Sequence, residues 1–256
     1  MAVAGIDIGS LSTDVVILSG DGIIAYAIVP TLSSSESAGR SAYDAALESA
    51  GMSASDITAV VATGYGRTSI DFADKAITEI TCHALGARRL FAEAKTVVDI
   101  GGQDSKVIRL SKDGRVEDFS MNDKCAAGTG RFLEVMARSL DTSLDLLGSL
   151  SALSSADVRI SSTCTVFAES EVVALVAKGV SKEDIIRGLH RSVAERVYAM
   201  ITRLRAEPPF VMTGGVAKNS GVVAALEERL GASLLLPEEP QIVGALGAAI
   251  IAGRGD

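Results

Sequence analysis

The chain has 256 residues, of which 48% are hydrophobic and 4% aromatic, and it carries a formal net charge of −8. This length allows one large domain or two of average size, while the negative charge and the absence of Trp argue against nucleic acids or anionic membranes as partners. No apolar run reaches the roughly 18 residues that span a bilayer, and the N-terminus lacks the pattern of a signal peptide, so we expect a cytoplasmic protein without a membrane partner.

Cysteines and histidines are few. Cys82, Cys125 and Cys164 are too widely spaced for a disulfide framework, so we expect thiols or metal ligands. Two histidines leave little material for a histidine-based metal site or catalytic triad. We expect His83 to lie at the surface or in the core rather than to act as a ligand, and His190 to lie at the surface.

The first elements of the chain recur later in the sequence. Asp7-Ile8-Gly9-Ser10 is matched by Asp99-Ile100-Gly101-Gly102, and the match continues without a gap to Asp21-Gly22 and Asp113-Gly114. Each copy predicts a strand, a glycine turn, a second strand, an Asp-Gly hairpin and a third strand. Two copies of one supersecondary unit imply two similar domains.

The glycine turn of each copy suits a phosphate. Glycine lets backbone N–H groups face the phosphate, Ser10, Ser12 and Thr13 add further donors, and an aspartate can hold hydrated Mg²⁺ or orient water. One such loop would be weak evidence, because strand-Asp-Gly turns are common in ordinary α/β proteins. Two loops that face each other would clamp a polyphosphate.

The next stretch predicts a helix over 36–51, a buried strand over 58–62 and a helix from Glu79 to about Ala94. The strand runs into the glycine-rich loop Thr63-Gly64-Tyr65-Gly66-Arg67. Such loops often lie beside the ligand in α/β folds, and a plain turn is equally compatible with this sequence.

Cys125 precedes the loop Gly128-Thr129-Gly130 and an amphipathic helix, which Asn122 or Asp123 is expected to cap. The positive end of a helix dipole favours a thiolate or an anionic cluster at this cysteine. The two glycines allow the close approach of a phosphate or of another backbone segment. A buried, inert cysteine is the alternative. The apolar face of the helix would carry Phe132, Leu133, Met136 and Leu140.

The last third of the chain repeats this arrangement. A predicted strand over Asp157–Ser162 leads to Cys164, which stands at the start of a helix that stops at Gly179. A second cysteine in the same setting favours a shared role. A long helix over 181–205 and a buried strand over 210–213 follow.

The strand over 210–213 leads into Gly214-Gly215 and on to Lys218. This strand-Gly-Gly-helix junction suits a ribose or purine, and a tight turn is the alternative. A final helix that begins with Gly244 contains mostly small residues, which permits close helix packing or a hinge.

Several of these motifs resemble one family: the activator ATPases of 2-hydroxyacyl-CoA dehydratases and the related ATPase subunits of benzoyl-CoA reductases. This family lies within the acetate kinase, sugar kinase, Hsp70 and actin superfamily. The resemblance spans nearly the whole chain and is carried by Ala62–Arg67, Glu79–Ala84, Asp99–Lys106, Asn122–Phe132 and Thr163–Glu171.

The resemblance implies an α/β fold of two ribonuclease H-like domains related by duplication, with ATP in the cleft between them. Residues 1–95, completed by a C-terminal helix over 241–256, would form the first domain, and residues 96–240 the second. Asp7 and Asp99 would hold Mg²⁺ and place water, and Gln103 would help to orient the attacking water. The other nucleotide contacts would be Gly9, Ser10, Ser12, Thr13, Gly101, Gly102, Asp104, Gly128, Thr129, Gly130, Gly214, Gly215, Lys218 and Gly244.

The resemblance also implies a homodimer with one [4Fe–4S] cluster, ligated by Cys125 and Cys164 of each chain. Two cysteines from each of two chains supply four thiolates, the number that such a cluster usually takes. A ferredoxin or flavodoxin would reduce the cluster, and ATP or ADP binding would control delivery of the electron to a partner iron–sulfur dehydratase, reductase or double-cubane-cluster protein. Cys82 belongs to a different motif and is left out of the cluster.

The chain departs from the family pattern at one position. Relatives commonly carry Lys where this chain has Asp14, while Lys106 occupies the matching place in the second repeat. An aspartate cannot contact phosphate as a lysine does, so ATP hydrolysis would be slower or differently tuned. Two alternatives are a small-molecule kinase of the same superfold and an ATP-driven filament protein, and neither explains two cysteines at helix starts.

Overall fold

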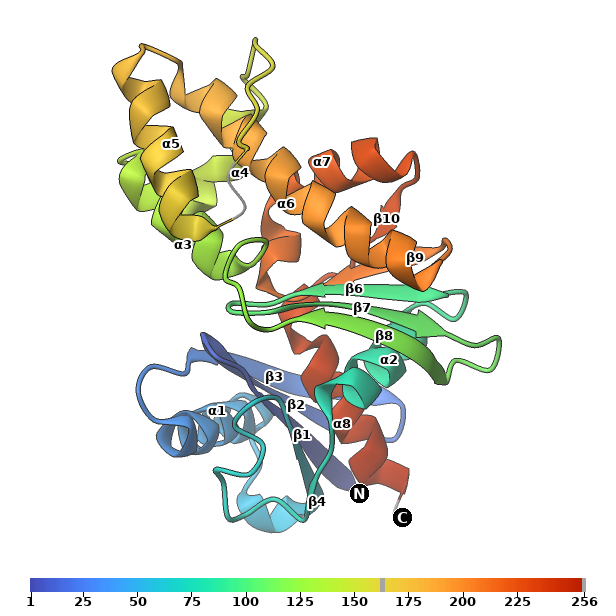
Figure 1. Cartoon of the computed structure of the whole chain (residues 1–256). Coiled ribbons are helices and arrows are strands. Elements are labelled where there is room, and N and C mark those ends of the chain that lie inside the picture. The colour runs from blue at the N-terminus through green and yellow to red at the C-terminus, as the bar shows by residue number, and fades with distance from the viewer. Residues whose placement is uncertain (162–163, 255–256) are drawn as a thin grey trace.

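The protein is described by a computed structural model over residues 1–161 and 164–254. Over these residues it contains two five-stranded mixed sheets, one in each half of the molecule (Figure 1). The strand order is β3-β2-β1-β4-β5 in the first sheet and β10-β9-β6-β7-β8 in the second. The strands are β1 (Ala2–Ile8), β2 (Ser12–Ser19), β3 (Gly22–Pro30), β4 (Ile57–Thr63), β5 (Lys75–Ala76), β6 (Thr96–Ile100), β7 (Ser105–Leu110), β8 (Val116–Asn122), β9 (Phe210–Thr213) and β10 (Leu234–Leu235).

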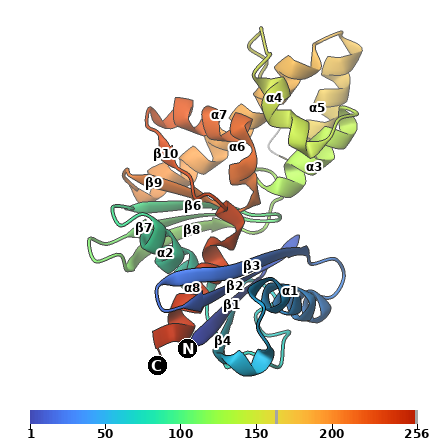
Figure 2. The same cartoon turned by 180° about the vertical axis from the view of Figure 1, so that it is seen from behind.

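The helices cover these sheets and build an extension beyond the second one. They are α1 (Ser35–Ala50), α2 (Glu79–Leu90), α3 (Gly130–Ser139), α4 (Leu147–Ser151), α5 (Thr165–Ala177), α6 (Lys182–Leu204), α7 (Ser220–Leu230) and α8 (Val243–Arg254). Figure 2 shows α1 on the outer face of the first sheet and α6 and α7 beyond the second, with α3, α4 and α5 gathered at one end. No helix in the described part of the chain is long and apolar enough to cross a membrane.

The strand pattern predicted for the sequence repeat is confirmed. β1, β2 and β3 form one antiparallel meander, and β6, β7 and β8 form the other. A further strand runs parallel to the first strand of each meander, β4 beside β1 and β9 beside β6. The glycine turns therefore follow equivalent strands in the two sheets. Where the chain divides into independently moving domains stays a prediction.

Alternation along β2 explains why both faces of the first sheet are covered. Val15 and Ile17 lie in the core under α1, whereas Val16 and Leu18 pack against α8. In the second half, Ile80 on α2 packs on one face of the sheet, and the long helix α6 covers the opposite face. As a result α2 and α8 lie between the two sheets, beside the strand ends that carry the glycine turns.

The small residues of α8 let it pack closely against α2 and β1. A Cβ atom on Gly247 would overlap the carbonyl oxygen of Cys82, and one on Gly5 would overlap the carbonyl oxygen of Ala245. A Cβ on Gly253, on the same helix, would meet only Val3 Cγ2 at an ordinary 3.7 Å. The small-residue helix is therefore used for close packing.

Gly247→Ala is expected to lower the free energy of unfolding by about 2 kcal/mol or more, because backbone atoms on both helices would have to move apart. Gly253→Ala is the matched control and is expected to be neutral or to stabilise by up to about 1 kcal/mol, since alanine favours the helix. Urea denaturation of both variants measures the difference. Equal stability of the two would show that α2 and α8 do not need this contact.

Two predicted segments differ in the structure. Residues 157–161 form no strand, and Ser162, the end of the predicted strand, lies outside the described residues. Backbone N–H groups nearby are satisfied by side chains: the Glu171 carboxylate accepts from the Ser161 amide at 3.0 Å, and Asp184 accepts from the two amides before Asp157. The helix predicted to reach Ala94 ends at Leu90, after which the chain turns toward β6.

The cap of the helix after Cys125 and the place of His190 also differ. The helix begins at Gly130 with Thr129 as its N-cap, so neither Asn122 nor Asp123 caps it. Asn122 instead ends β8 and donates from Nδ2 to the carbonyl oxygens of Cys125 (2.9 Å) and Ala127 (3.3 Å), which shapes the loop. His190 is completely buried rather than exposed, because α6 turns it toward α7.

Candidate active site

A cavity of about 580 Å³ lies between the two halves of the molecule. Both glycine turns line it, together with the strand-Gly-Gly junction after β9. The lining residues predicted from the sequence are Asp7, Gly9, Ser10, Ser12, Asp99, Gly101, Gly102, Asp104, Gly130, Gly214, Gly215 and Lys218. The structure thus brings residues from four parts of the chain, 7–12, 99–104, Gly130 and 214–218, to one cavity.

The two glycine turns have the same local geometry and touch each other. The Gly9 amide donates to the Ser12 carbonyl oxygen at 2.9 Å, and the Gly101 amide donates to the Asp104 carbonyl oxygen at 3.0 Å. A Cβ on Gly102 would come within 2.5 Å of Leu11 Cγ, so the first turn packs directly on the second. The two turns therefore lie side by side at the cavity, where their backbone N–H groups suit a polyphosphate.

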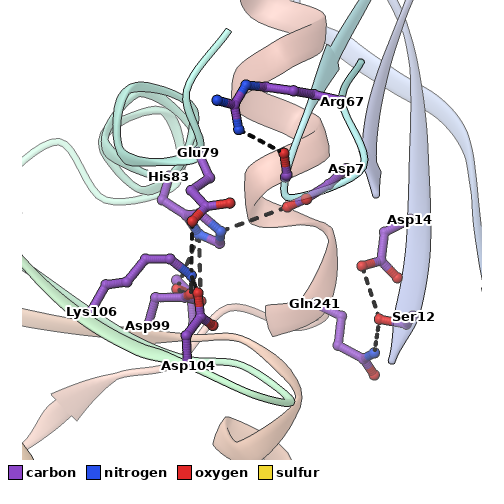
Figure 3. A network of polar contacts seen from close by, with 12 residues as sticks. Asp7, Ser12, Asp14, Arg67, Glu79, His83, Asp99, Asp104, Lys106 and Gln241 are labelled. Carbon is purple, nitrogen blue, oxygen red and sulfur yellow. Dashed lines mark hydrogen bonds and ion pairs between the residues drawn. The ribbon is translucent and has the colours of Figure 1, made fainter. Parts of the chain in front are cut away.

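His83 lies between the two aspartates that end β1 and β6 (Figure 3). Its Nε2 is 3.6 Å from Asp7 Oδ2, and its Nδ1 is 3.5 Å from Asp99 Oδ1. Thr213 Oγ1 donates to the same Asp99 oxygen at 2.8 Å. His83 is buried, which agrees with the expected core position and not with a surface position, and its imidazole also contacts an aspartate in each half of the site.

Lys106 forms a buried cluster with three carboxylates at the cavity. Its Nζ lies 2.7 Å from Asp104 Oδ2, 3.1 Å from Asp99 Oδ2 and 3.6 Å from Glu79 Oε1. Burial alone would raise the pKa of Asp99, but His83 and Lys106 together lower it to about 2. Burial would lower the pKa of Lys106, yet the three carboxylates raise it above its usual value. Both groups are charged at neutral pH.

In the first half of the site, the pKa values of the two aspartates are raised instead of lowered. Burial raises the pKa of Asp7 to about 6, although His83 opposes the shift. Burial, reinforced by the nearby charge of Asp7, raises the pKa of Asp14 to about 8. Asp14 Oδ2 accepts from Ser12 Oγ at 3.2 Å, whereas Asp14 Oδ1 has no hydrogen-bond partner among the described residues.

Asp14→Asn is expected to stabilise the nucleotide-free protein, and to do so more at pH 9 than at pH 5. The pKa of Asp14 is about 4 in the unfolded chain and about 8 in the folded protein, so the folded protein binds this proton more tightly. The free energy of unfolding of the parent therefore falls as the pH rises from about 4 to about 8. The amide does not titrate and avoids that loss of stability. Urea denaturation across this pH range measures the free energy of unfolding of variant and parent. A difference between the two that stays constant with pH would contradict the prediction.

Five residues predicted for the nucleotide do not line the cavity. Gln103 is exposed outside it. Thr13 Oγ1 is buried against Thr31 Oγ1 at 2.9 Å, and Thr129 Oγ1 donates to the Ala126 carbonyl oxygen at 2.6 Å. The other two are Gly128, whose Cβ position faces Arg196, and Gly244, whose Cβ would overlap Asp7 Oδ2. Gly244 leaves room for the Asp7 carboxylate.

No motif in the sequence predicted a further part of the cavity wall. This wall comes from α3, from the stretch 141–156, which carries two short helices, and from the start of α7. A Cβ on Gly148 would meet Ser220 Oγ at 2.5 Å, so the last two segments are in close contact. The residues concerned are Leu133, Glu134, Leu144, Asp145, Gly148, Ser149, Asn219 and Ser220, and Tyr65, Glu79 and Gln241 complete the cavity elsewhere.

The predicted cluster cysteines lie at the end of the second half where α3 and α5 gather. Cys164 is exposed and is the N-cap residue of α5, as its place in the sequence predicts. Cys125 is half-buried in the loop before α3. Ser139 on α3 donates to Glu169 on α5 at 3.0 Å, so the two helices are in contact. Cys82 is buried elsewhere, and burial raises its pKa to about 12.

Comparison with known proteins identifies this arrangement. The chain is 50% identical over 252 residues to the activator of lactoyl-CoA dehydratase from Anaerotignum propionicum, with 98% of this chain and 97% of the relative covered. It superposes with a TM-score of 0.95 on the activator of the 2-hydroxyisocaproyl-CoA dehydratase from Clostridium difficile with bound ADPNP, at 44% identity over 100% of this chain and 95% of that one.

A glucokinase from Streptomyces griseus, 15% identical with a TM-score of 0.61 and full coverage of both chains, shares the fold alone. The predicted two-lobed fold of the actin-like ATPases and sugar kinases is therefore confirmed. The family model of the BadF/BadG/BcrA/BcrD ATPases matches residues 4–252, and the chain belongs to this ATPase family.

Proposed function

We propose that this ATPase is an electron-transfer activator. It works as a cytoplasmic homodimer that holds one [4Fe–4S] cluster and uses ATP to deliver an electron to a partner iron–sulfur dehydratase or reductase. The descriptions of its relatives as dehydratase activators support a partner of this kind. The observation that carries the proposal is a backbone connection between the nucleotide cavity and the loop that contains Cys125.

The connection runs through the start of α3. The Gly130 amide donates to the Gly101 carbonyl oxygen at 2.9 Å, and the Arg131 amide donates to the Gly102 carbonyl oxygen at 2.8 Å. Both acceptors belong to the second glycine turn, which lines the cavity. A nucleotide-dependent shift of this turn would therefore move the start of α3 and, with it, the Cys125 loop.

The two cysteines fit a cluster that two subunits share. Each chain offers one exposed and one half-buried thiol at the same end of the molecule, and a [4Fe–4S] cluster usually takes four thiolates. Cys125 and Cys164 of both subunits would be its ligands. When bound, the cluster supplies a one-electron carrier whose potential depends on its surroundings.

The surface beside Cys164 supports a homodimer. The helix that Cys164 caps carries apolar side chains on its exposed side: Val166 is 66% exposed, Phe167 68% and Val173 56%. Exposed apolar patches of this kind mark protein–protein contacts. Contact between two copies of α5 would cover these side chains and bring the four cysteines together.

The ATP site would work through carboxylates and backbone amides. Asp7 and Asp99 would hold Mg²⁺ and position water, since both carboxylates reach the cavity and their oxygens are the ligand type that Mg²⁺ prefers. Lys106 keeps Asp99 ionised, and Thr213 fixes its orientation. Gly214, Gly215 and Lys218 would border the adenosine.

Coupling requires that the nucleotide distinguish two arrangements of the halves, because a ligand with equal affinity for both shifts nothing. A ferredoxin or flavodoxin would reduce the cluster before ATP acts. Neither a small-molecule kinase nor a filament protein accounts for an exposed cysteine at the end of an apolar helix face. The electron-transfer function is therefore the one that the geometry supports best.

The rate at which an Fe(II) chelator removes iron tests this coupling. With anaerobic protein and bathophenanthroline disulfonate, we expect the rates in MgADP and in MgATP to differ by at least about fivefold, a usual size of coupling between sites. The Asp44→Lys variant changes an exposed residue on α1 that does not line the cavity, and it should show the same difference between the two nucleotides as the parent. Equal rates in the two nucleotides would contradict a connection between the cavity and the cluster.

A further inference from the structure

The two halves of the ATP site differ in one matched pair of residues. Asp99 on β6 lies opposite Lys106 on β7, and the two form an ion pair at 3.1 Å. At the equivalent place in the first half, Asp7 on β1 lies opposite Asp14 on β2. Directly opposite residues have Cβ atoms about 5 Å apart. The second half therefore neutralises its aspartate with an ammonium group, whereas the first half places two carboxyl groups together.

The surroundings of Asp14 leave its carboxyl group without a positive partner. The residue is 5% exposed, and its Oδ1 has no hydrogen-bond partner in the part of the chain that the structure describes. Its Oδ2 accepts from Ser12 Oγ, which in turn accepts from Gln241 Nε2 at 3.2 Å. Lys218, a cation that acts on Asp14, pairs with Glu239 at 2.8 Å, and Glu239 adds a further negative charge to these surroundings.

Asp14 nevertheless lines the cavity, together with Asp7. Its side chain is two bonds shorter than that of a lysine, so the space that a lysine ammonium would occupy stays within the cavity. A buried carboxylate without a compensating charge is unfavourable, and binding of triphosphate would add more negative charge at the same place. A small cation in this space would balance both.

We propose that Asp14 and Asp7 bind a monovalent cation of the potassium or ammonium type, completed by water and phosphate oxygens of ATP, at the place that corresponds to the Lys106 ammonium in the second half. The proposal rests on ATP hydrolysis and not on electron transfer.

The test compares chloride salts at constant ionic strength and saturating Mg²⁺. We expect ATP affinity, measured with a fluorescent ATP analogue, and the rate of ATP hydrolysis to be about tenfold higher in KCl or NH₄Cl than in tetramethylammonium chloride, which is too large for the site. Tenfold corresponds to about 1.4 kcal/mol. Equal values in all salts would overturn the proposal and leave the electron-transfer function untouched.

Two variants assign the effect to Asp14. Asp14→Lys places an ammonium group in the first half, as Lys106 does in the second, and is expected to bring the ratio between the salts to about one. Asp14→Asn removes the carboxyl group that would become charged when a cation binds, and is expected to do the same, which covers the case in which the lysine variant fails to fold. Asp44→Lys, an equal change in charge outside the cavity, should keep the parent ratio. A parent ratio in Asp14→Asn would also overturn the proposal.

Discussion

Replacement of Cys125 by serine is expected to remove most of the iron from the anaerobically purified protein while the fold and ATP hydrolysis persist. Asn122 Nδ2 holds the loop around Cys125 by donating to the carbonyl oxygens of Cys125 and Ala127. A serine oxygen is a poor substitute for a soft thiolate ligand of an iron–sulfur cluster. Iron and acid-labile sulfide analysis, with a visible spectrum, measures the loss.

Cys164→Ser should lose the cluster to the same extent, because both cysteines are proposed as ligands. Cys82→Ala is the matched control. This third cysteine is buried on α2, and its replacement should leave the iron content of folded protein unchanged. Full iron in the Cys125→Ser protein would refute the ligand assignment and, with it, the shared cluster.

Replacement of Asp99 by asparagine is expected to reduce ATP turnover by at least about a hundredfold, the usual size of effect when a group that positions the reacting atoms is lost. The fold should persist, since Lys106 keeps its contacts with Asp104 and Glu79, and Thr213 can still donate to the amide oxygen. The cluster should remain, because α3 and α5 are untouched. Phosphate release and iron content measure the two effects.

The control for Asp99→Asn is Asp113→Asn. Asp113 is exposed in the hairpin between β7 and β8, on the same sequence repeat but outside the cavity. Its turnover should match that of the parent. Unchanged turnover in the Asp99→Asn protein would remove Asp99 from the reacting centre and leave Asp7 as the candidate for Mg²⁺.

The fold could be predicted from the sequence because its strands and hairpin turns have local sequence signals, and these signals occur twice in the chain. Short, mostly apolar runs predict β1, β2, β6 and β7 as buried strands, and the Asp-Gly hairpins fix the pairing of the second and third strands of each copy. Two matching copies therefore predicted two sheets with their glycine turns at equivalent ends. The same local signals predicted α6 with its bounds nearly unchanged.

His83 shows what such reasoning could not supply. Its contacts with Asp7 and Asp99 exist because glycines such as Gly86 and Gly247 let α2 and α8 come close together between the sheets. No periodicity in the sequence around residue 83 encodes this approach. The wall formed by residues 144–149 was missed for the same reason, since short helices are placed by tertiary contacts and not by their own pattern.

Asp14 was visible in the sequence as a departure, but its consequence needed the structure. The repeat alone aligns it with Lys106. Only the paired strands show that each of these residues faces the aspartate of its own half, and only the hydrogen bonds show that Asp14 Oδ1 is left without a partner among the described residues. These observations show that the first half lacks the positive charge that Lys106 supplies to Asp99 in the second half.

The central claim, a dimer that shares one iron–sulfur cluster, is tested most directly on protein purified without oxygen. Iron and sulfide analysis together with the mass from light scattering should give about four irons per dimer, with a colour that bleaches on reduction. A colourless, iron-free monomer that still hydrolyses ATP would contradict the claim and favour a small-molecule kinase built on the same fold.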